Sequence, residues 1–161
     1  MILHAGLLAA HVDGAWRGVL IEGPSGSGKS DLALRALDHG FRLVADDRVA
    51  LWACEGALYG RAPDTLAGLI EVRGLGVLRE PALPFCRIAL AVACEQHERM
   101  PEPAFKDYVG LSIPSLSLQA LESSAPAKLR RALQHLGAWP DKAYLDALAV
   151  GVSPRPGGDS R

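Results

Sequence analysis

Short apolar segments separated by turn-forming residues dominate the first half of this chain. Residues 2–12 and 16–22 are rich in Leu, Ala, Val and Ile, and they flank Asp13-Gly14. Asp-Gly between two apolar runs is typical of a two-residue hairpin turn, so the pattern predicts a pair of antiparallel strands. Residues 41–45, Phe-Arg-Leu-Val-Ala, predict a third strand.

A second hairpin and a further strand follow in the middle of the chain. Residues 49–53 and 57–59 are mostly apolar and flank Glu55-Gly56, which predicts another tight turn. Residues 88–93, Ile-Ala-Leu-Ala-Val-Ala, predict a buried strand. This run is far too short to cross a lipid bilayer, so no membrane partner is expected.

Helical spacing of apolar residues occurs in three segments. Residues 32–37 place Leu and Ala on one face, and Gly40 follows as a glycine cap. Residues 115–121 and 127–136 also have helical spacing, and Pro126 suits the first turn of the second of these helices. The pattern therefore predicts an α/β fold: a mixed sheet with antiparallel hairpins, and helices in the C-terminal third.

Length and composition indicate one globular domain. The 161 residues are 49% apolar and 22% charged, which predicts a single domain over residues 1–152. Residues 153–161 are rich in Pro and Gly and are expected to be disordered. The net charge of −1 provides no basic field, so nucleic acid is not an expected partner.

The three cysteines give information about the compartment. Cys54, Cys86 and Cys94 form no C-x-x-C motif, so neither a disulfide framework nor a zinc site is indicated. Small, buried, apolar cysteines in a reducing compartment are the better interpretation. The expected location is the cytoplasm.

A glycine-rich segment carries the clearest chemical signal. Residues 23–30, Gly-Pro-Ser-Gly-Ser-Gly-Lys-Ser, fit the P-loop pattern G-x-x-x-x-G-K-[ST] between a predicted strand and a predicted helix. Backbone N–H groups of such a loop bind phosphate, while the lysine contacts the β- and γ-phosphates and the final serine binds Mg²⁺. A glycine-rich turn with an incidental lysine is the alternative, which the flanking elements disfavour. The residues expected to bind ATP are Gly23, Ser25, Gly26, Ser27, Gly28, Lys29 and Ser30.

Two adjacent aspartates are candidates for the chemistry of phosphoryl transfer. Asp46 and Asp47 come directly after the strand at residues 41–45, where α/β sheets present residues that contact ligands. Adjacent residues of an extended chain point in opposite directions. One aspartate could therefore face the transferred phosphoryl group while the other faces metal or the loop. A solvated turn is the alternative.

A third segment, residues 70–77, reads Ile-Glu-Val-Arg-Gly-Leu-Gly-Val. In an extended chain Glu71 and Arg73 lie on one face, opposite the apolar residues between them. Glu71 could help to bind Mg²⁺, a cation that prefers oxygen ligands. An exposed Glu–Arg pair on an edge strand is the alternative, and the spacing alone does not decide between them.

Residues 23–31, 43–49 and 70–77, in this order, resemble the motifs of the HPr kinase/phosphorylase family. The resemblance is strong over residues 1–80 and weak beyond them. It implies the catalytic domain of a serine protein kinase that uses ATP and Mg²⁺, with a P-loop fold similar to phosphoenolpyruvate carboxykinase-like kinases. It also implies an HPr-like phosphocarrier protein of a phosphotransferase system as partner, a regulatory role in carbon or nitrogen metabolism, and homo-oligomers such as hexamers.

The resemblance also implies roles for individual residues. Asp46 would be the general base that takes the proton of the acceptor serine, and the acid in the reverse reaction. Asp47 would support Mg²⁺ and the loop, and Glu71 would join the metal site with Ser30. His4 falls where the family keeps a histidine near the phosphates; a structural or surface histidine is the alternative.

The chain also departs from the family. Between residues 100 and 121 nothing corresponds to the segment with a basic residue used in phosphorolysis, and Arg99, Lys106 and Arg73 are the nearby basic residues. Kinase activity is therefore better supported than phosphorylase activity. A small-molecule P-loop kinase is a second hypothesis, which residues 71–77 argue against. A nucleotide-binding sensor without transferase activity is a third, which the missing basic segment favours.

Overall fold

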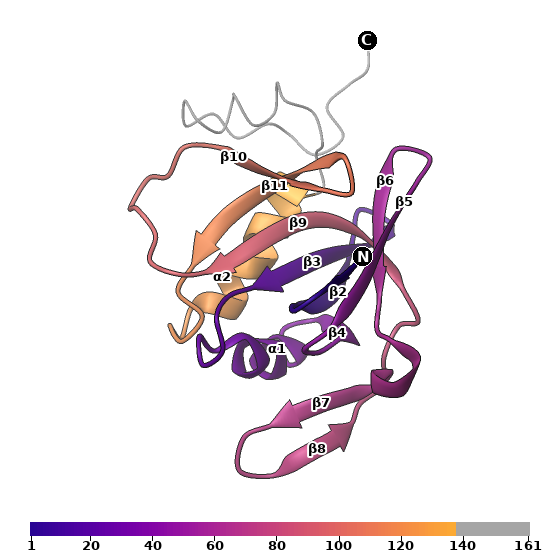
Figure 1. Ribbon diagram of the computed structural model, residues 1–161. Coiled ribbons are helices and arrows are strands. Elements are labelled where there is room, and N and C mark those ends of the chain that lie inside the picture. The colour runs from indigo at the N-terminus through magenta and orange to yellow at the C-terminus, as the bar shows by residue number, and fades with distance from the viewer. Residues whose placement is uncertain (138–161) are drawn as a thin grey trace.

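The computed structural model describes residues 1–137, which form a curled sheet with helices packed on one face (Figure 1). The tail expected to be disordered, residues 153–161, and the last part of the expected domain, residues 138–152, lie outside the described residues. The strands are β1 (Ile2–Leu3), β2 (Gly6–Val12), β3 (Ala15–Glu22), β4 (Phe41–Ala45), β5 (Val49–Cys54), β6 (Ala57–Arg61), β7 (Leu69–Val72), β8 (Gly76–Arg79), β9 (Cys86–Cys94), β10 (Ala104–Tyr108) and β11 (Leu111–Leu118). The helices are α1 (Lys29–Leu37) and α2 (Ala125–Ala132), with short helical turns at Asp64–Leu66 and Leu133–Gly137.

Both predicted hairpins are confirmed. β2 pairs antiparallel with β3 around Asp13 and Gly14, whose φ angles are 50° and 80°. β5 pairs antiparallel with β6 around Glu55 and Gly56, whose φ angles are 49° and 75°. Positive φ at both central residues is the geometry of a type I′ turn, whose twist matches the flanking strands. The first predicted strand is divided, because β1 separates from β2 and pairs with β5.

β9 organises the sheet, which has nine strands among residues 1–137, because its neighbours change along its length. Its first residues pair antiparallel with β6, and its last residues pair parallel with β11. On its other side β9 runs parallel to β3, and the sheet continues through β2 to β4. The parallel strands β3, β9 and β11 point the same way in Figure 1 and end at one edge of the sheet. This is the edge at which α/β proteins bind ligands.

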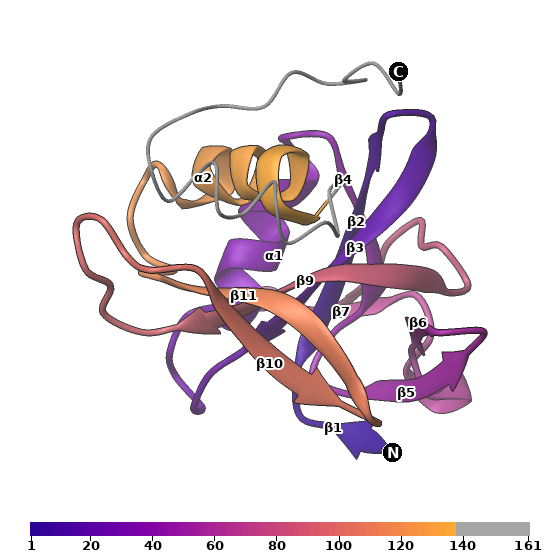
Figure 2. The same cartoon turned by 90° about the horizontal axis from the view of Figure 1, so that it is seen from above.

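The sheet is buried on both faces, because neighbouring residues of a strand enter different cores. Leu8 and Ile21 lie in the core that α1 and α2 cover, whereas Leu7 and Leu20 lie in the core that β5 and β6 enclose. All four side chains are fully buried. Figure 2 shows the two helices beside each other over one face. Burial on both faces explains why the central strands read as continuous apolar runs in the sequence.

Two of the three predicted helices are confirmed. α1 contains the predicted residues 32–37, and the chain then turns at Gly40, whose φ is 85°. α2 has Pro126 in its first turn, as predicted, and buries Leu129 in the core beneath it. Leu133, in the helical turn that follows, is also fully buried. Within residues 1–137 no helix is long and apolar enough to cross a membrane.

The predicted helix over residues 115–121 is wrong, because most of these residues belong to β11. The segment from residue 115 to 118 reads Ser-Leu-Ser-Leu, a period of two that is typical of a strand. Leu116 and Leu118 pack in the core with α2, while Ser117 points to the other face and donates a hydrogen bond to Glu95. The C-terminal third described here is therefore partly strand and partly helix.

β7 and β8 form a separate two-stranded hairpin that extends from the body of the protein (Figure 1). Ile70 and Val72 are buried in the core beside α1, whereas Glu71 between them is exposed. This alternation confirms the extended arrangement predicted for the segment. The hairpin thereby holds Glu71 near the first turn of α1.

Candidate active site

A cavity of about 520 Å³ lies beside the carboxyl end of β3 and contains residues from all three sequence motifs. Its volume is within the range of roughly 300–1,000 Å³ that is usual for small-molecule sites. The predicted site residues that line it are His4, Ser25, Gly26, Gly28, Lys29, Ser30, Asp46, Asp47 and Glu71. Gly23 and Ser27 do not line it. The Ser27 hydroxyl is buried close beside Gly23 and has no hydrogen-bond partner among residues 1–137.

The glycine-rich loop, residues 23–30, leads directly into α1. Gly26 and Gly28 have φ angles of 81° and 95°, a conformation that only glycine adopts without strain. The loop is closed by a hydrogen bond of 3.0 Å from the Ser27 N–H to the Pro24 carbonyl. Because α1 begins at Lys29, the unpaired N–H groups of its first turn lie at the cavity, and such groups attract anions.

The side chain of Lys29 folds back over the beginning of the glycine-rich loop. Its ammonium group donates hydrogen bonds to the carbonyls of Gly23 and Pro24, the second at 3.0 Å. An ammonium group has three donors, so one remains for a ligand. Lys29 therefore both stabilises the loop and places a positive charge at the cavity.

Asp46 connects the three motifs. Within residues 1–137 it is the one charged side chain that is buried, with 7% of its surface exposed. Its Oδ1 accepts a hydrogen bond of 3.0 Å from the Ser30 hydroxyl, and its Oδ2 accepts one of 3.0 Å from the Glu71 N–H. A buried carboxylate needs such donors to offset the loss of its hydration. The glycine-rich loop, the end of β4 and the β7–β8 hairpin are thus held together by one side chain.

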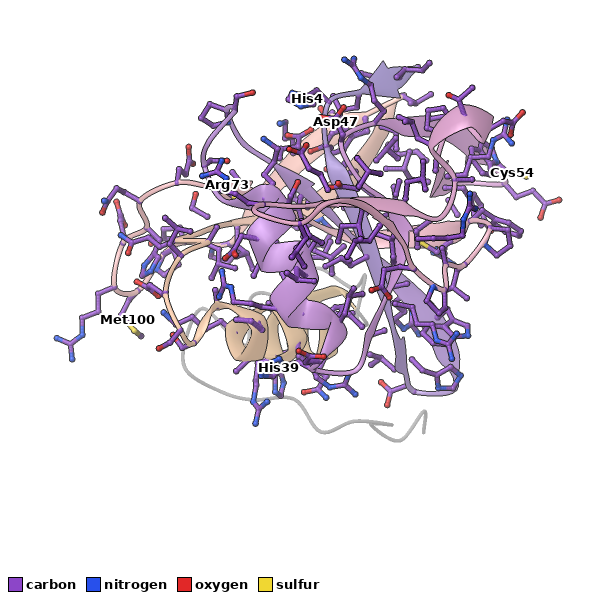
Figure 3. The ribbon with its side chains drawn as sticks, turned by 90° about the horizontal axis from the view of Figure 1, so that it is seen from below. His4, His39, Asp47, Cys54, Arg73 and Met100 are labelled. Carbon is purple, nitrogen blue, oxygen red and sulfur yellow. The ribbon has the colours of Figure 1, made fainter. Side chains whose placement is uncertain are left out.

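Asp47 pairs with His4. Its φ of 68° is unusual for a residue other than glycine, and such strain is concentrated at functional sites. His4 Nε2 lies 2.8 Å from Asp47 Oδ1, and Arg48 Nε lies 3.6 Å from Asp47 Oδ2. Figure 3 shows His4 and Asp47 next to each other. The sequence therefore predicted both side chains at the cavity, but Asp46, not Asp47, is the aspartate that contacts the glycine-rich loop.

The oxygen atoms around Ser30 fit a magnesium ion that arrives with a phosphate ligand. No group of three or more His, Cys, Asp or Glu side chains in the described part of the chain is arranged to hold a metal by itself. Mg²⁺ is usually bound by one or two carboxylates, with water and substrate phosphates as further ligands. The Ser30 hydroxyl and the Glu71 carboxylate line the same cavity and are oxygen ligands of this kind. The Asp46 carboxylate, 3.0 Å from the Ser30 hydroxyl, adds negative charge beside them.

Two of the three cysteines are buried, as predicted, and one of them supports the glycine-rich loop. A Cβ atom placed on Gly23 would lie 3.0 Å from Cys94 Cβ, so Cys94 packs directly against the loop. Burial raises the pKa of the Cys94 thiol, while the nearby charge of Lys29 acts in the opposite direction. Burial raises the pKa of Cys86 to about 12. The prediction is wrong for Cys54, which is exposed at the end of β5.

Sequence reasoning missed several residues that line the cavity. Leu121 follows β11 and lies within the segment that was wrongly predicted as a helix. Asp31 and Leu34 belong to the first turns of α1. Arg73, one of the three basic residues considered from the sequence, also lines the cavity, at the turn between β7 and β8. The only signal for Asp31 and Leu34 was their position after the loop, and nothing in the sequence indicated Leu121.

Comparison with known proteins relates the first half of the chain to one family. The sequence profile of the HPr Serine kinase C-terminal domain matches residues 3–83. A protein of Clostridium tetani named HPr kinase/phosphorylase is 50% identical over 66 residues, which are 41% of this chain and 22% of that protein. The protein of the same name from Clostridium acetobutylicum is 48% identical over 66 residues, with the same two shares. The chain thus matches about a fifth of the length of these curated relatives.

A solved structure has the same fold. The HPr(Ser) kinase/phosphatase from Coxiella burnetii matches with a TM-score of 0.70 and 24% identity, over 83% of this chain and 88% of that chain. This likeness confirms a mixed α/β fold with a curled sheet and few helices. The segment matched by the family profile contains the glycine-rich loop, Asp46, Asp47 and Glu71. The chain belongs to the family of the HPr serine kinase C-terminal domain.

Proposed function

We propose that this protein is an ATP-dependent kinase that phosphorylates a serine of an HPr-like phosphocarrier protein. One observation carries the proposal: the glycine-rich loop, Asp46 and Glu71 meet in one cavity, within the segment that the family profile matches. Two relatives that are about half identical to this segment are named HPr kinase/phosphorylase, which supports the same reaction.

The glycine-rich loop would act as a P-loop that binds ATP. Its backbone N–H groups and the first turn of α1 would bind the phosphates, and Lys29 would add a positive charge beside the γ-phosphate. Ser30 and Glu71 would hold Mg²⁺, with Asp46 hydrogen-bonded to the Ser30 hydroxyl. When bound, Mg²⁺ offsets negative charge on the phosphates during transfer.

Asp46 would also act as the general base toward the acceptor. A serine hydroxyl is a weak nucleophile near neutral pH, so a fixed carboxylate that takes its proton assists the attack. An ionised carboxylate has about four acceptor sites, and the donors from Ser30 and Glu71 leave capacity for the serine O–H. The proton passes to Asp46 as the serine oxygen bonds to the γ-phosphorus and the bond from phosphorus to ADP breaks. Asp47 would hold the His4 ring beside the phosphates.

The reverse reaction would need a basic group for inorganic phosphate. Of the three basic residues considered from the sequence, Arg73 lines the cavity, whereas Arg99 and Lys106 line a different groove. Lys106 is also paired with Glu22. We therefore assign Arg73 as the basic residue for any phosphorolysis of the phosphoserine.

Mass spectrometry tests the proposed reaction. The protein is incubated with ATP, Mg²⁺ and a phosphocarrier of the sugar or the nitrogen system, and the carrier is then analysed for a phosphoryl group on serine. The expected result is one phosphoserine on a carrier and no phosphorylated product from a panel of metabolites. Phosphorylation of a metabolite alone would favour a small-molecule kinase, and ATP binding without any transfer would favour a nucleotide sensor.

The setting of this reaction is part of the same proposal. We expect it in the cytoplasm, where ATP and the phosphocarriers are found, with a regulatory role in carbon or nitrogen metabolism. We also expect the protein to form homo-oligomers, hexamers by resemblance to the family. Analytical ultracentrifugation of the purified protein measures this directly, and a monomer at micromolar concentration would contradict it.

A further inference from the structure

The loop after β11 brings an exposed leucine to the mouth of the cavity. Leu121 has 71% of its surface exposed and lines the cavity. It also packs on the glycine-rich loop, since a Cβ atom on Gly28 would lie 2.9 Å from Leu121 Cδ2. Single exposed apolar side chains are common on protein surfaces. The position of this one, directly over the proposed phosphate-binding loop, is what points to a function.

One arginine holds this leucine in place. The guanidinium of Arg35, on α1, donates from Nη2 to the Ala120 carbonyl and from Nη1 to the Glu122 carbonyl, the latter at 3.0 Å. These two carbonyls come immediately before and after Leu121. Arg35 Nε in turn donates to Asp31 Oδ2 at 2.9 Å. The planar fork of arginine presents a separate nitrogen atom to each carbonyl in a fixed geometry, whereas lysine has only one nitrogen atom.

A second set of contacts, from α2 and from the segment after β9, holds the same loop. The Glu122 carboxylate accepts a hydrogen bond of 2.6 Å from Lys128, and His97 Nε2 lies 3.7 Å from it. The Ala125 N–H donates to the Glu122 carbonyl at 3.0 Å. The backbone around Leu121 is therefore fixed by both helices, although its side chain is exposed.

The order of strands places the leucine on the side of the loop opposite the proposed chemistry. Asp46 follows β4, which lies two strands from β3 on one side. Leu121 follows β11, which lies two strands from β3 on the other side. The glycine-rich loop follows β3, between them. A nucleotide with its γ-phosphate toward Asp46 therefore directs its nucleoside toward Leu121.

We propose that Leu121 is the apolar wall against which the nucleoside of the bound nucleotide packs, and that Arg35 is the positioning residue that holds this wall over the loop. This inference rests on the proposed function, because it takes the phosphates to be bound by the glycine-rich loop. It concerns the base and ribose, not the phosphates, of a nucleoside triphosphate. Leu34, which lines the same cavity, adds apolar surface from α1.

Binding of ATP and of inorganic tripolyphosphate separates the two parts of the ligand. Leu121→Ala is expected to weaken ATP binding about fivefold, since it removes part of an apolar contact, and to leave tripolyphosphate binding unchanged. Leu75→Ala is the matched control, because Leu75 is 73% exposed and does not line the cavity. Leu121→Met keeps the apolar bulk and should retain ATP affinity.

Arg35→Lys tests the positioning role. This variant keeps the positive charge but loses the two separate nitrogen atoms that meet the two carbonyls, so it should also weaken ATP binding while leaving tripolyphosphate binding unchanged. In the transfer assay, both Leu121→Ala and Arg35→Lys should raise the KM for ATP with kcat unchanged. Melting temperatures of all variants establish that each is folded.

The outcomes distinguish this inference from the proposed function. If Leu121→Ala binds ATP as the wild type does, or if it loses affinity for ATP and for tripolyphosphate equally, the proposed contact of Leu121 with the nucleoside is refuted. Phosphate binding by the glycine-rich loop would still stand. If Arg35→Lys binds ATP normally, its positioning role is refuted. If the wild type binds neither ligand, phosphate binding by the loop is refuted, and this inference falls with it.

Discussion

Replacing Asp46 by alanine and by asparagine separates the structural role of this side chain from its chemical role. In the wild type its two oxygens accept hydrogen bonds from the Ser30 hydroxyl and the Glu71 N–H, both at 3.0 Å. Alanine removes both acceptors. Asparagine can keep both contacts, because its Oδ1 accepts from the Glu71 N–H while its Nδ2 donates to the Ser30 oxygen, and a hydroxyl can accept as well as donate.

The expected losses of stability for the two variants differ enough to be measured. Hydrogen bonds to a charged group contribute about 1.5–3 kcal/mol each, but removing the buried carboxylate also removes its desolvation cost, so Asp46→Ala should cost about 2–3 kcal/mol. For a domain of this size, 1 kcal/mol lowers the Tm by about 2–4 °C, so a fall of about 4–12 °C is expected. Asp46→Asn should stay within about 1 kcal/mol of the wild type.

Thermal unfolding followed by circular dichroism, together with ATP binding, checks this prediction. Asp46→Asn should unfold near the wild-type Tm and still bind ATP, because the loop keeps its contact with β4. Asp46→Ala should unfold earlier and bind ATP weakly. If the two variants are equally destabilised, or if alanine has no effect, then Asp46 does not hold the motifs together in the way described.

Three further predictions concern other parts of the fold. In the native protein a thiol reagent should label Cys54 rapidly and spare Cys86, because burial raises the pKa of Cys86 to about 12; fast labelling of a buried cysteine would contradict the packing. The hydrogen bond from Lys128 lowers the pKa of Glu122 below its ordinary value of 4.5, so its contribution to stability is present above pH 4.5 and is lost as the pH falls through the lowered value. The melting temperature of Lys128→Met should therefore lie below that of the wild type near neutral pH and equal it in acid. The same difference in melting temperature at every pH would refute this. Gly60→Ala should destabilise the protein by about 1–3 kcal/mol in urea unfolding, the usual cost of overpacking a core, since a Cβ atom there would lie 2.7 Å from a side chain; unchanged stability would contradict the close packing.

The parts of the fold that could be predicted are those that depend on neighbouring residues. The turn at Asp13-Gly14 needs positive φ at two adjacent residues, and Asp-Gly provides it locally. The glycine-rich loop was predicted for the same reason, since its chemistry lies in consecutive residues. The segment over residues 115–121 was mispredicted because its leucines fit a helical spacing over a short window as well as an alternation of two. Only pairing with β9 decides between them.

The candidate site was predictable residue by residue but not as an arrangement. The sequence indicated that Asp46 and Glu71 could both serve the reaction, yet the bond between them joins residues 25 positions apart. No feature of the neighbouring sequence indicated which of the two aspartates would be buried, because the positive φ of Asp47 is set by the turn after β4. The contact of Arg35 with Ala120 spans 85 positions and depends on β11 ending beside α1. Such contacts arise from tertiary packing.

The central claim is that this cavity transfers the γ-phosphoryl group of ATP to a protein serine with Asp46 as the base. Asp46→Asn removes the charge while keeping the contacts, so its transfer rate in a single turnover, measured at saturating ATP and phosphocarrier, tests the claim most directly. The expected result is ATP binding like that of the wild type, with transfer to the carrier serine reduced at least about 100-fold, the usual lower limit for loss of a general base. Transfer by Asp46→Asn at the wild-type rate would contradict the account.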